Sequence, residues 1–133
     1  MKKLLIVALF GLLGSPGVRA ELAPSAYEAM QKAAPERLEI EVLRIEVTPA
    51  SEPGNRNIHI LALVTGVSRS KEGVAIGEVL NIVFQVPEIA PPRSAPAPIP
   101  VPAEKEKTVA YLAKKPQSPN FNPVAGSMSF REF

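Results

Sequence analysis

Apolar and charged residues alternate along residues 38–47, which read Leu-Glu-Ile-Glu-Val-Leu-Arg-Ile-Glu-Val. A period of two is typical of a strand that packs one face against a core. The alternation breaks once. Leu38, Ile40 and Val42 share one face, and after a shift of one residue the apolar positions are Leu43, Ile45 and Val47. A β-bulge at Val42 and Leu43 absorbs the extra residue and bends the strand. A long, bent first strand over residues 38–48 favours a small coiled barrel over a flat sheet.

The pattern predicts four further strands. Apolar residues fill both faces of residues 60–64, within a second strand over residues 57–67, so this strand is expected at the centre of the sheet. Gly77 interrupts a third strand over residues 74–86 and indicates a bend or a bulge. Two shorter strands complete the set, over residues 107–113 and 124–130.

Residues 21–37 precede the first strand and contain a short predicted helix. Ser25 followed by Glu28 matches the capping box, in which both side chains satisfy N-terminal backbone N–H groups. Pro35 ends the helix, because the residue before a proline avoids the helical region. The helix has an apolar face that is expected to pack on the barrel, formed by Tyr27, Met30 and Ala34.

Residues 87–102 differ in kind from the rest of the chain, since seven of these 16 residues are proline. Each proline removes a backbone donor, so neither a strand nor a helix tolerates this density, and polyproline II is the expected conformation. Such a stretch either offers itself to an aromatic-lined groove of a partner or serves as a loop. We favour a loop that is pinned to the barrel by Ile89, Ile99 and Val101.

Together these elements predict an all-β fold, a small five-stranded OB-like β-barrel with a short N-terminal helix and a proline-rich crossing loop. The layout resembles the OB-fold, and with a strand such as Gly-Glu-Val-Leu-Asn-Ile at residues 77–82 it is similar to the netrin and tissue-inhibitor-of-metalloproteinases type of OB domain. The inhibitors of that family act through a cysteine at the mature N-terminus. This sequence has no cysteine, so neither that activity nor any functional residue carries over.

The first 20 residues resemble a secretory signal peptide. Lys2 and Lys3 precede a short apolar stretch over residues 4–13, and Val18-Arg19-Ala20 fits the small-x-small cleavage rule. The apolar stretch is too short to span a bilayer, which disfavours a retained membrane helix, and we expect no other transmembrane segment. The expected organisation is a signal peptide, 1–20, a helical segment, 21–37, and a barrel domain, 38–133.

Removal of the signal peptide changes the charge of the chain. The whole chain has 15 Lys and Arg against 13 acids, and its first 20 residues hold three cations and no acid, so the mature part carries 12 against 13, net −1. The basic pI therefore belongs to the signal peptide. With few aromatic residues besides, the chain lacks the basic, stacking groove of a nucleic-acid binder. The absence of cysteine excludes disulfides and thiolate sites and suits a bacterial periplasmic protein.

The sequence shows no catalytic or metal-binding constellation, and no cofactor is expected. His59 is the only histidine, and a catalytic relay lacks a nucleophile motif, so a surface-facing or hydrogen-bonded strand histidine is favoured. Glu39 and Glu41 alternate with apolar residues and are expected on a solvated face. One histidine, no cysteine and dispersed glutamates do not give the spacing of metal ligands. We therefore do not expect an enzyme.

Any ligand is expected where OB-folds usually bind, on the face of strands two and three. Two loops frame this face: one joins strands one and two, and the other joins strands four and five. Here these loops are residues 49–56 and 114–123. Phe121 is either tucked into the barrel mouth or offered to a partner, and tucking is favoured because a single loop aromatic usually caps a core. The candidate rim consists of Asn55, Arg56, Lys114, Lys115, Asn120 and Phe121.

These observations favour an exported, periplasmic or secreted, non-catalytic binding or adaptor protein of the bacterial cell envelope. Its partner is expected to be a protein or a small-molecule ligand, and not a nucleic acid. The alternative is a structural component of an envelope protein assembly, which contributes its proline stretch or a strand edge to a partner.

Overall fold

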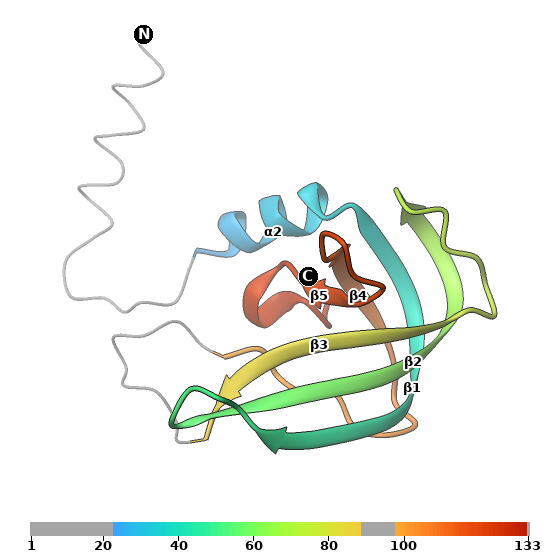
Figure 1. The fold of residues 1–133 in the computed structure, drawn as a ribbon. Helices are drawn as coiled ribbons and strands as arrows, with labels where there is room; N and C mark the ends of the chain where they lie inside the picture. Colours follow the sequence, from blue (N-terminus) through green and yellow to red (C-terminus); the bar gives the residue numbers. More distant parts are fainter. Residues whose placement is uncertain (1–22, 89–97, 133) are drawn as a thin grey trace, which may run out of the picture.

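The computed structural model describes residues 23–88 and 98–132 of the chain (Figure 1). The expected signal peptide and Ile89 of the proline stretch lie outside these residues. The described elements are helix α2 (Pro24–Ala33), strands β1 (Glu36–Pro49), β2 (Asn55–Ser70), β3 (Val79–Pro87), β4 (Lys107–Lys114) and β5 (Phe121–Pro123), and the 3₁₀-helix η1 (Gly126–Met128).

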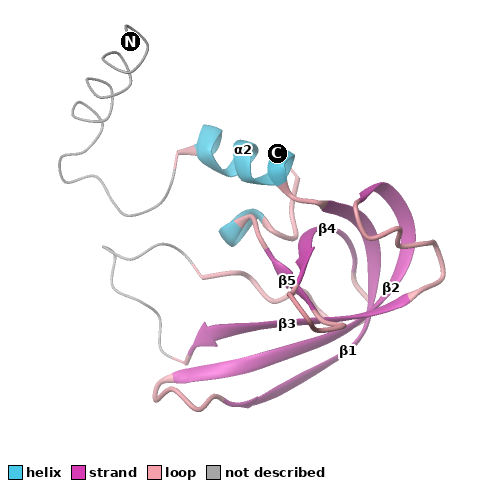
Figure 2. Ribbon diagram, turned by 45° about the horizontal axis from the view of Figure 1, so that its top comes forward, coloured by secondary structure: helices cyan, strands magenta, loops and turns pink. Residues whose placement is uncertain are grey.

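The five strands form a closed barrel in the order β1-β2-β3-β5-β4. Neighbouring strands run antiparallel except β3 and β5, which run parallel and meet at Ile82 and Phe121. Helix α2 lies outside the barrel, next to the C-terminal segment (Figure 2). The predicted fold class, a small all-β, OB-like barrel with one short helix, is confirmed.

One face of each long strand builds the core. On β2, every second residue from Ile58 to Val64 is at most 2% exposed, and β3 and β4 show a similar alternation. Leu38, Ile40 and Val42 of β1 are fully buried, as the alternation predicts. Because side chains in a strand point to opposite faces in turn, this burial also fixes which residues point outward.

Leu43 lies in a β-bulge, because Val42 and Arg44 pair with successive residues of β2 and leave Leu43 between them unpaired. The predicted bulge is therefore confirmed. Beyond it, Ile45 lies opposite Ile60 and Val47 opposite Ile58, both core residues, so the apolar alternation continues on the core side of the strand. Burial, however, fades along this half. Only Ile45 packs partly on the core, whereas Leu43 and Val47 are 41% and 50% exposed. The physical reason is that β4 pairs only with the first half of β1, so the far half has no opposite wall to pack against.

Strand β3 begins at Val79, five residues after the predicted start at residue 74. Gly77 has a φ of +96°, which residues with a side chain rarely adopt, and its N–H donates to the carbonyl of Val64 at 2.8 Å. Val64 donates in turn to the carbonyl of Glu78 at 2.8 Å. Gly77 thus marks a bend, as predicted, but the bend folds the loop onto β2 and precedes the strand.

The strand predicted over residues 124–130 is wrong. The closing strand β5 is only three residues long and lies inside the predicted loop, and the predicted segment contains η1 instead. Gly126 has a φ of +55°, and Ser129 Oγ donates to its carbonyl at 2.7 Å and accepts from the N–H of Ala125 at 3.0 Å. Local bonds from a serine side chain compete with strand pairing, which explains the turn.

Helix α2 begins at Pro24, whose fixed φ suits a first helical position, and no side chain caps its N-terminus. The predicted capping box of Ser25 and Glu28 is therefore wrong. Tyr27 and Ala34 are 5% and 2% exposed, which confirms that the apolar face of the helix packs inward.

The described residues of the proline stretch lie at its two ends, and both ends contact the barrel. Pro87 is the last residue of β3, and Ile99 packs on the core. Val101 is 39% exposed, so the prediction of a pinned loop is confirmed for Ile99 and wrong for Val101.

Two polar side chains tie helix α2 to the rest of the molecule. Gln31, only 7% exposed, donates Nε2 to the carbonyls of Met128 at 2.9 Å and Arg131 at 2.7 Å. Arg69 of β2 donates Nε to the carbonyl of Ala34 at 2.9 Å and Nη2 to that of Gln31 at 2.8 Å. These carbonyls lie at the C-terminal end of the helix, where a cation also complements the helix dipole.

Candidate functional site

The side of β2 and β3 that faces away from the core is the strongest candidate for a binding surface. The buried residues of β2 alternate with His59, Leu61 and Leu63, which therefore point outward. Each of these residues has a residue of β3 directly opposite, in the pairs His59–Val83, Leu61–Asn81 and Leu63–Val79. We call these six residues the outer face.

The centre of the outer face is apolar although it is not part of the core. Leu61, Leu63 and Val83 are half-buried, and Val79 is 49% exposed. Ile76, 68% exposed, lies in the loop that leads into β3 at the Val79 end. An antiparallel sheet with one solvated face normally alternates apolar inside with polar outside. A contiguous apolar group on such a face therefore marks a candidate interaction site.

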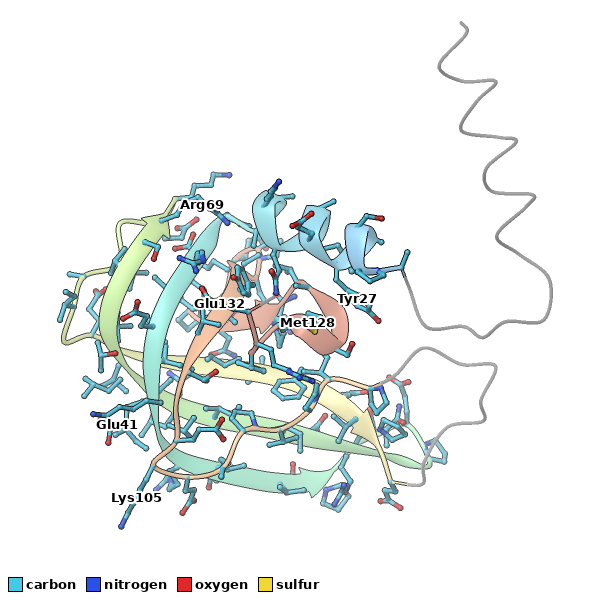
Figure 3. All side chains as sticks on the ribbon, turned by 180° about the vertical axis from the view of Figure 1, so that it is seen from behind. Tyr27, Glu41, Arg69, Lys105, Met128 and Glu132 are labelled. Carbon is cyan, nitrogen blue, oxygen red and sulfur yellow. The ribbon has the colours of Figure 1, made fainter. Side chains whose placement is uncertain are left out.

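Charged residues of β1 border the outer face on one side. In the register of β1 and β2, Glu41 lies opposite Leu63, Arg44 opposite Leu61, and Glu46 opposite His59. Glu41 is seen on the outside of β1 in Figure 3. Glu46 Oε1 lies 3.6 Å from Arg44 Nη2 and 3.6 Å from His59 Nδ1. Exposed pairs of this kind contribute little to stability, so their loss on contact with a partner costs little.

His59 is a hydrogen-bonded strand histidine, as the sequence predicts. Its Nε2 lies 2.8 Å from Asn81 Oδ1, on the neighbouring strand of the outer face. Its other ring nitrogen faces the Glu46 carboxylate. Both ring nitrogens are thus directed at polar neighbours, which holds the ring in place at the polar end of the outer face.

The structure does not bring the two predicted rim loops together. Asn55 lies opposite Pro87 at one end of β3, whereas Phe121 lies beside Ile82. Five residues of strand separate these positions, roughly 17 Å along β3. Arg56 is next to Asn55 and exposed, so it belongs to the first location only.

The remaining predicted rim residues lie on the loop between β4 and β5. Lys114 and Lys115 are exposed. The backbone N–H of Lys115 donates to the backbone carbonyl of Asn120 at 2.9 Å, which closes the loop on itself. Phe121 is 5% exposed and belongs to the barrel core, so of the two alternatives for this ring the structure has the tucked one.

Neither a metal-ligand cluster nor a membrane-spanning helix is found among the described residues. Across residues 23–88 and 98–132, no three His or Glu side chains gather where they could hold a metal ion. In the same ranges, no helix has both the length and the apolar character needed to cross a bilayer.

Comparison with known proteins gives no relative, because no family model, no curated protein and no solved structure matches this chain. The likeness to the netrin type of OB domain stays a prediction that rests on the strand layout. A functional assignment therefore depends on the surface of the molecule itself.

Proposed function

We propose that the chain is an exported, non-catalytic binding protein of the bacterial cell envelope, which docks a protein partner on its outer face. The observation that carries this proposal is the outward apolar ladder of Leu61, Leu63, Val79 and Val83. These side chains do not contribute to the closed core. Their burial by a partner would remove apolar surface from water, which favours association.

The composition of this surface suits a protein partner better than a small molecule. Opposite side chains on neighbouring strands stand about 5 Å apart and follow each other about 7 Å along the strand, so they form a broad face. An apolar centre with a charged and polar border is the usual anatomy of a protein interface. Here the border is formed by Glu41, Arg44 and Glu46 on one side.

Export is the second part of the proposal, and it rests on the sequence of residues 1–20. A mature chain that begins at Glu21, measured by intact mass in an envelope fraction, supports export. Intact residues 1–20 in that fraction contradict it.

A structural role in an envelope assembly is the second candidate, and the far half of β1 supports it. Among the described residues, no strand pairs with the second edge of β1 beyond residue 42. An open strand edge accepts a strand from another chain. In that case the contact would run through backbone groups of β1 and would not depend on Leu61 or Val79.

Site-specific photo-crosslinking in the cells that make the protein separates the two candidates. A crosslinking amino acid at position 79 should give one discrete adduct, which an excess of wild-type protein made in the same cells suppresses. The double variant Leu61→Lys with Val79→Lys should fail to suppress it while its melting temperature stays close to that of the wild type.

The matched control places the crosslinker at position 115, which is exposed on the loop between β4 and β5. The same adduct from position 115, or full suppression by the double variant, would contradict docking on the outer face. A third variant carries the crosslinker at position 47, at the open edge of β1. An adduct obtained from this variant alone would favour the assembly role.

A further inference from the structure

A separate open hollow of about 320 Å³ lies at the end of the barrel that carries helix α2. Three cations line it, Lys32 from the helix, Arg37 from β1 and Arg69 from β2, together with two carboxylates, Glu28 and Glu132. Figure 3 shows Arg69 and Glu132 on this side of the molecule, beside the helix. The outer face of β2 and β3 has no residue in common with it.

Arg37 is held in a fixed orientation inside this hollow. Its Nε donates to the hydroxyl of Tyr111 at 3.1 Å, and its guanidinium lies 5.7 Å from the centre of the Tyr111 ring. Its Nη1 donates to Ser68 Oγ at 2.8 Å. Tyr111 is only 4% exposed, so the platform below the guanidinium is rigid. A guanidinium positioned in this way presents its outer N–H groups for a carboxylate.

In the structure the Glu132 carboxylate takes that position, as an ion pair with Nη2 of Arg37. The Glu132 side chain is 54% exposed and the Arg37 side chain 31% exposed, so water reaches the pair. Replacement of one carboxylate by another at such an exposed pair costs little.

The C-terminal segment does not depend on this ion pair for its position. Gln31 holds the carbonyls of Met128 and Arg131, and the backbone N–H of Tyr111 donates to the carbonyl of Ser129 at 2.9 Å. Glu132 can therefore leave Arg37 while the preceding residues stay in place.

We propose that the hollow binds a small carboxylate ligand at Arg37, and that Glu132 occupies the ligand's place in the free protein. A volume of about 320 Å³ is at the lower end for small-molecule sites, so an acid the size of an amino acid fits it. Once Glu132 has moved aside, three cations and one carboxylate, that of Glu28, remain among the described lining residues, which favours an anion.

Calorimetric titration of the full mature chain with glutarate tests this site. Glutaramide has the same length and no charge and is the matched control ligand. We expect glutarate to bind and glutaramide not to bind. In the variant Arg37→Lys, which keeps the charge but loses the planar fork, glutarate binding should weaken by about tenfold or more.

The variant Glu132→Gln distinguishes a competitor for the ligand's place from a purely structural ion pair, which predicts no gain in affinity. Removal of the internal competitor should tighten glutarate binding by about two- to sixfold, because the free fraction of Arg37 rises. Lys115→Gln removes an exposed cation outside the hollow and should leave the affinity unchanged.

The proposal is overturned if glutarate binds neither the wild type nor Glu132→Gln, if glutaramide binds equally well, or if Glu132→Gln leaves the affinity unchanged. Undiminished binding in a folded Arg37→Lys variant would also overturn it. If Arg37→Lys does not fold, Glu132→Gln decides alone, because the Glu132 side chain is exposed and Gln31 holds the segment before it.

Discussion

At the scale of single residues, Glu36 shows how a charged side chain serves the fold. It is fully buried, and its carboxylate accepts hydrogen bonds from Ser70 Oγ and from the backbone N–H groups of Lys71 at 3.1 Å and Glu72 at 3.3 Å. These donors lie at the turn that ends β2. The sequence pattern did not indicate this role, because alternation sorts residues by face and does not reveal partners that are 34–36 positions away.

Replacement of Glu36 by Ala should lower the free energy of unfolding by about 2–4 kcal/mol, since two backbone donors and a hydroxyl lose their buried acceptor. Urea denaturation of the mature chain measures this change. Glu52→Ala, at an exposed position in the loop between β1 and β2, is the matched control and should change the value by less than about 0.5 kcal/mol. Equal effects of the two substitutions would show that the Glu36 carboxylate is not structural.

At the scale of elements, the length of a strand decides whether its sequence pattern can predict it. The long strand β1 shows its period over residues 38–47, and the bulge at Leu43 is visible because the period breaks there. Strand β2 has no such period at residues 60–64, and its length and its Ile, Leu and Val content indicate it instead. Strand β5 has three residues, too few for a period, and its pairing with β3 is a tertiary contact. The start of helix α2 differs from the prediction because Pro24 itself begins the helix, without a side-chain cap.

Deletion of Leu43 should be tolerated, with a loss of about 1–2 kcal/mol in the free energy of unfolding. Val42 and Arg44 already pair with successive residues of β2, so the shortened strand keeps every pairing and every inward side chain. Deletion of Val83 in β3 is the matched control, because β3 pairs with β2 without a bulge that could absorb the loss. It moves the inward residues on one side of the deletion to the outer side and should abolish cooperative folding. Thermal unfolding followed by circular dichroism compares the two, and a Leu43 deletion as damaging as that of Val83 would contradict this account of the bulge.

At the scale of the whole molecule, the sequence predicted a binding surface on strands two and three but placed its rim on two loops that lie apart. The apolar residues at positions 60–64 predict burial on both faces of a central strand. Strand β2 is indeed between β1 and β3, yet Leu61 and Leu63 face outward, with no described element over them. The way the barrel closes decides which side of β2 stays exposed. Closure depends on contacts between residues that are far apart in the sequence.

Removal of residues 124–133 should abolish cooperative unfolding, although the segment is not a strand. Phe130 is 6% exposed, its ring centre lies 6.0 Å from that of Phe84, and Thr108 Oγ1 donates to its carbonyl at 2.7 Å. The truncation therefore opens the core, and it also frees the Gln31 side chain that holds helix α2. Differential scanning calorimetry provides the measurement. A soluble truncated chain with an unchanged melting temperature would show that the segment is a dispensable tail.

Methyl NMR of the mature chain tests docking on the outer face most directly. The Leu and Val methyl groups are labelled, and the protein captured by the crosslinker at position 79 is purified and added. The account predicts that the methyl signals of Leu61, Leu63, Val79 and Val83 shift or broaden, while those of the buried Leu38 stay unchanged. Changes confined to Val101 in the proline stretch, or to Val47 at the edge of β1, would contradict docking on the outer face.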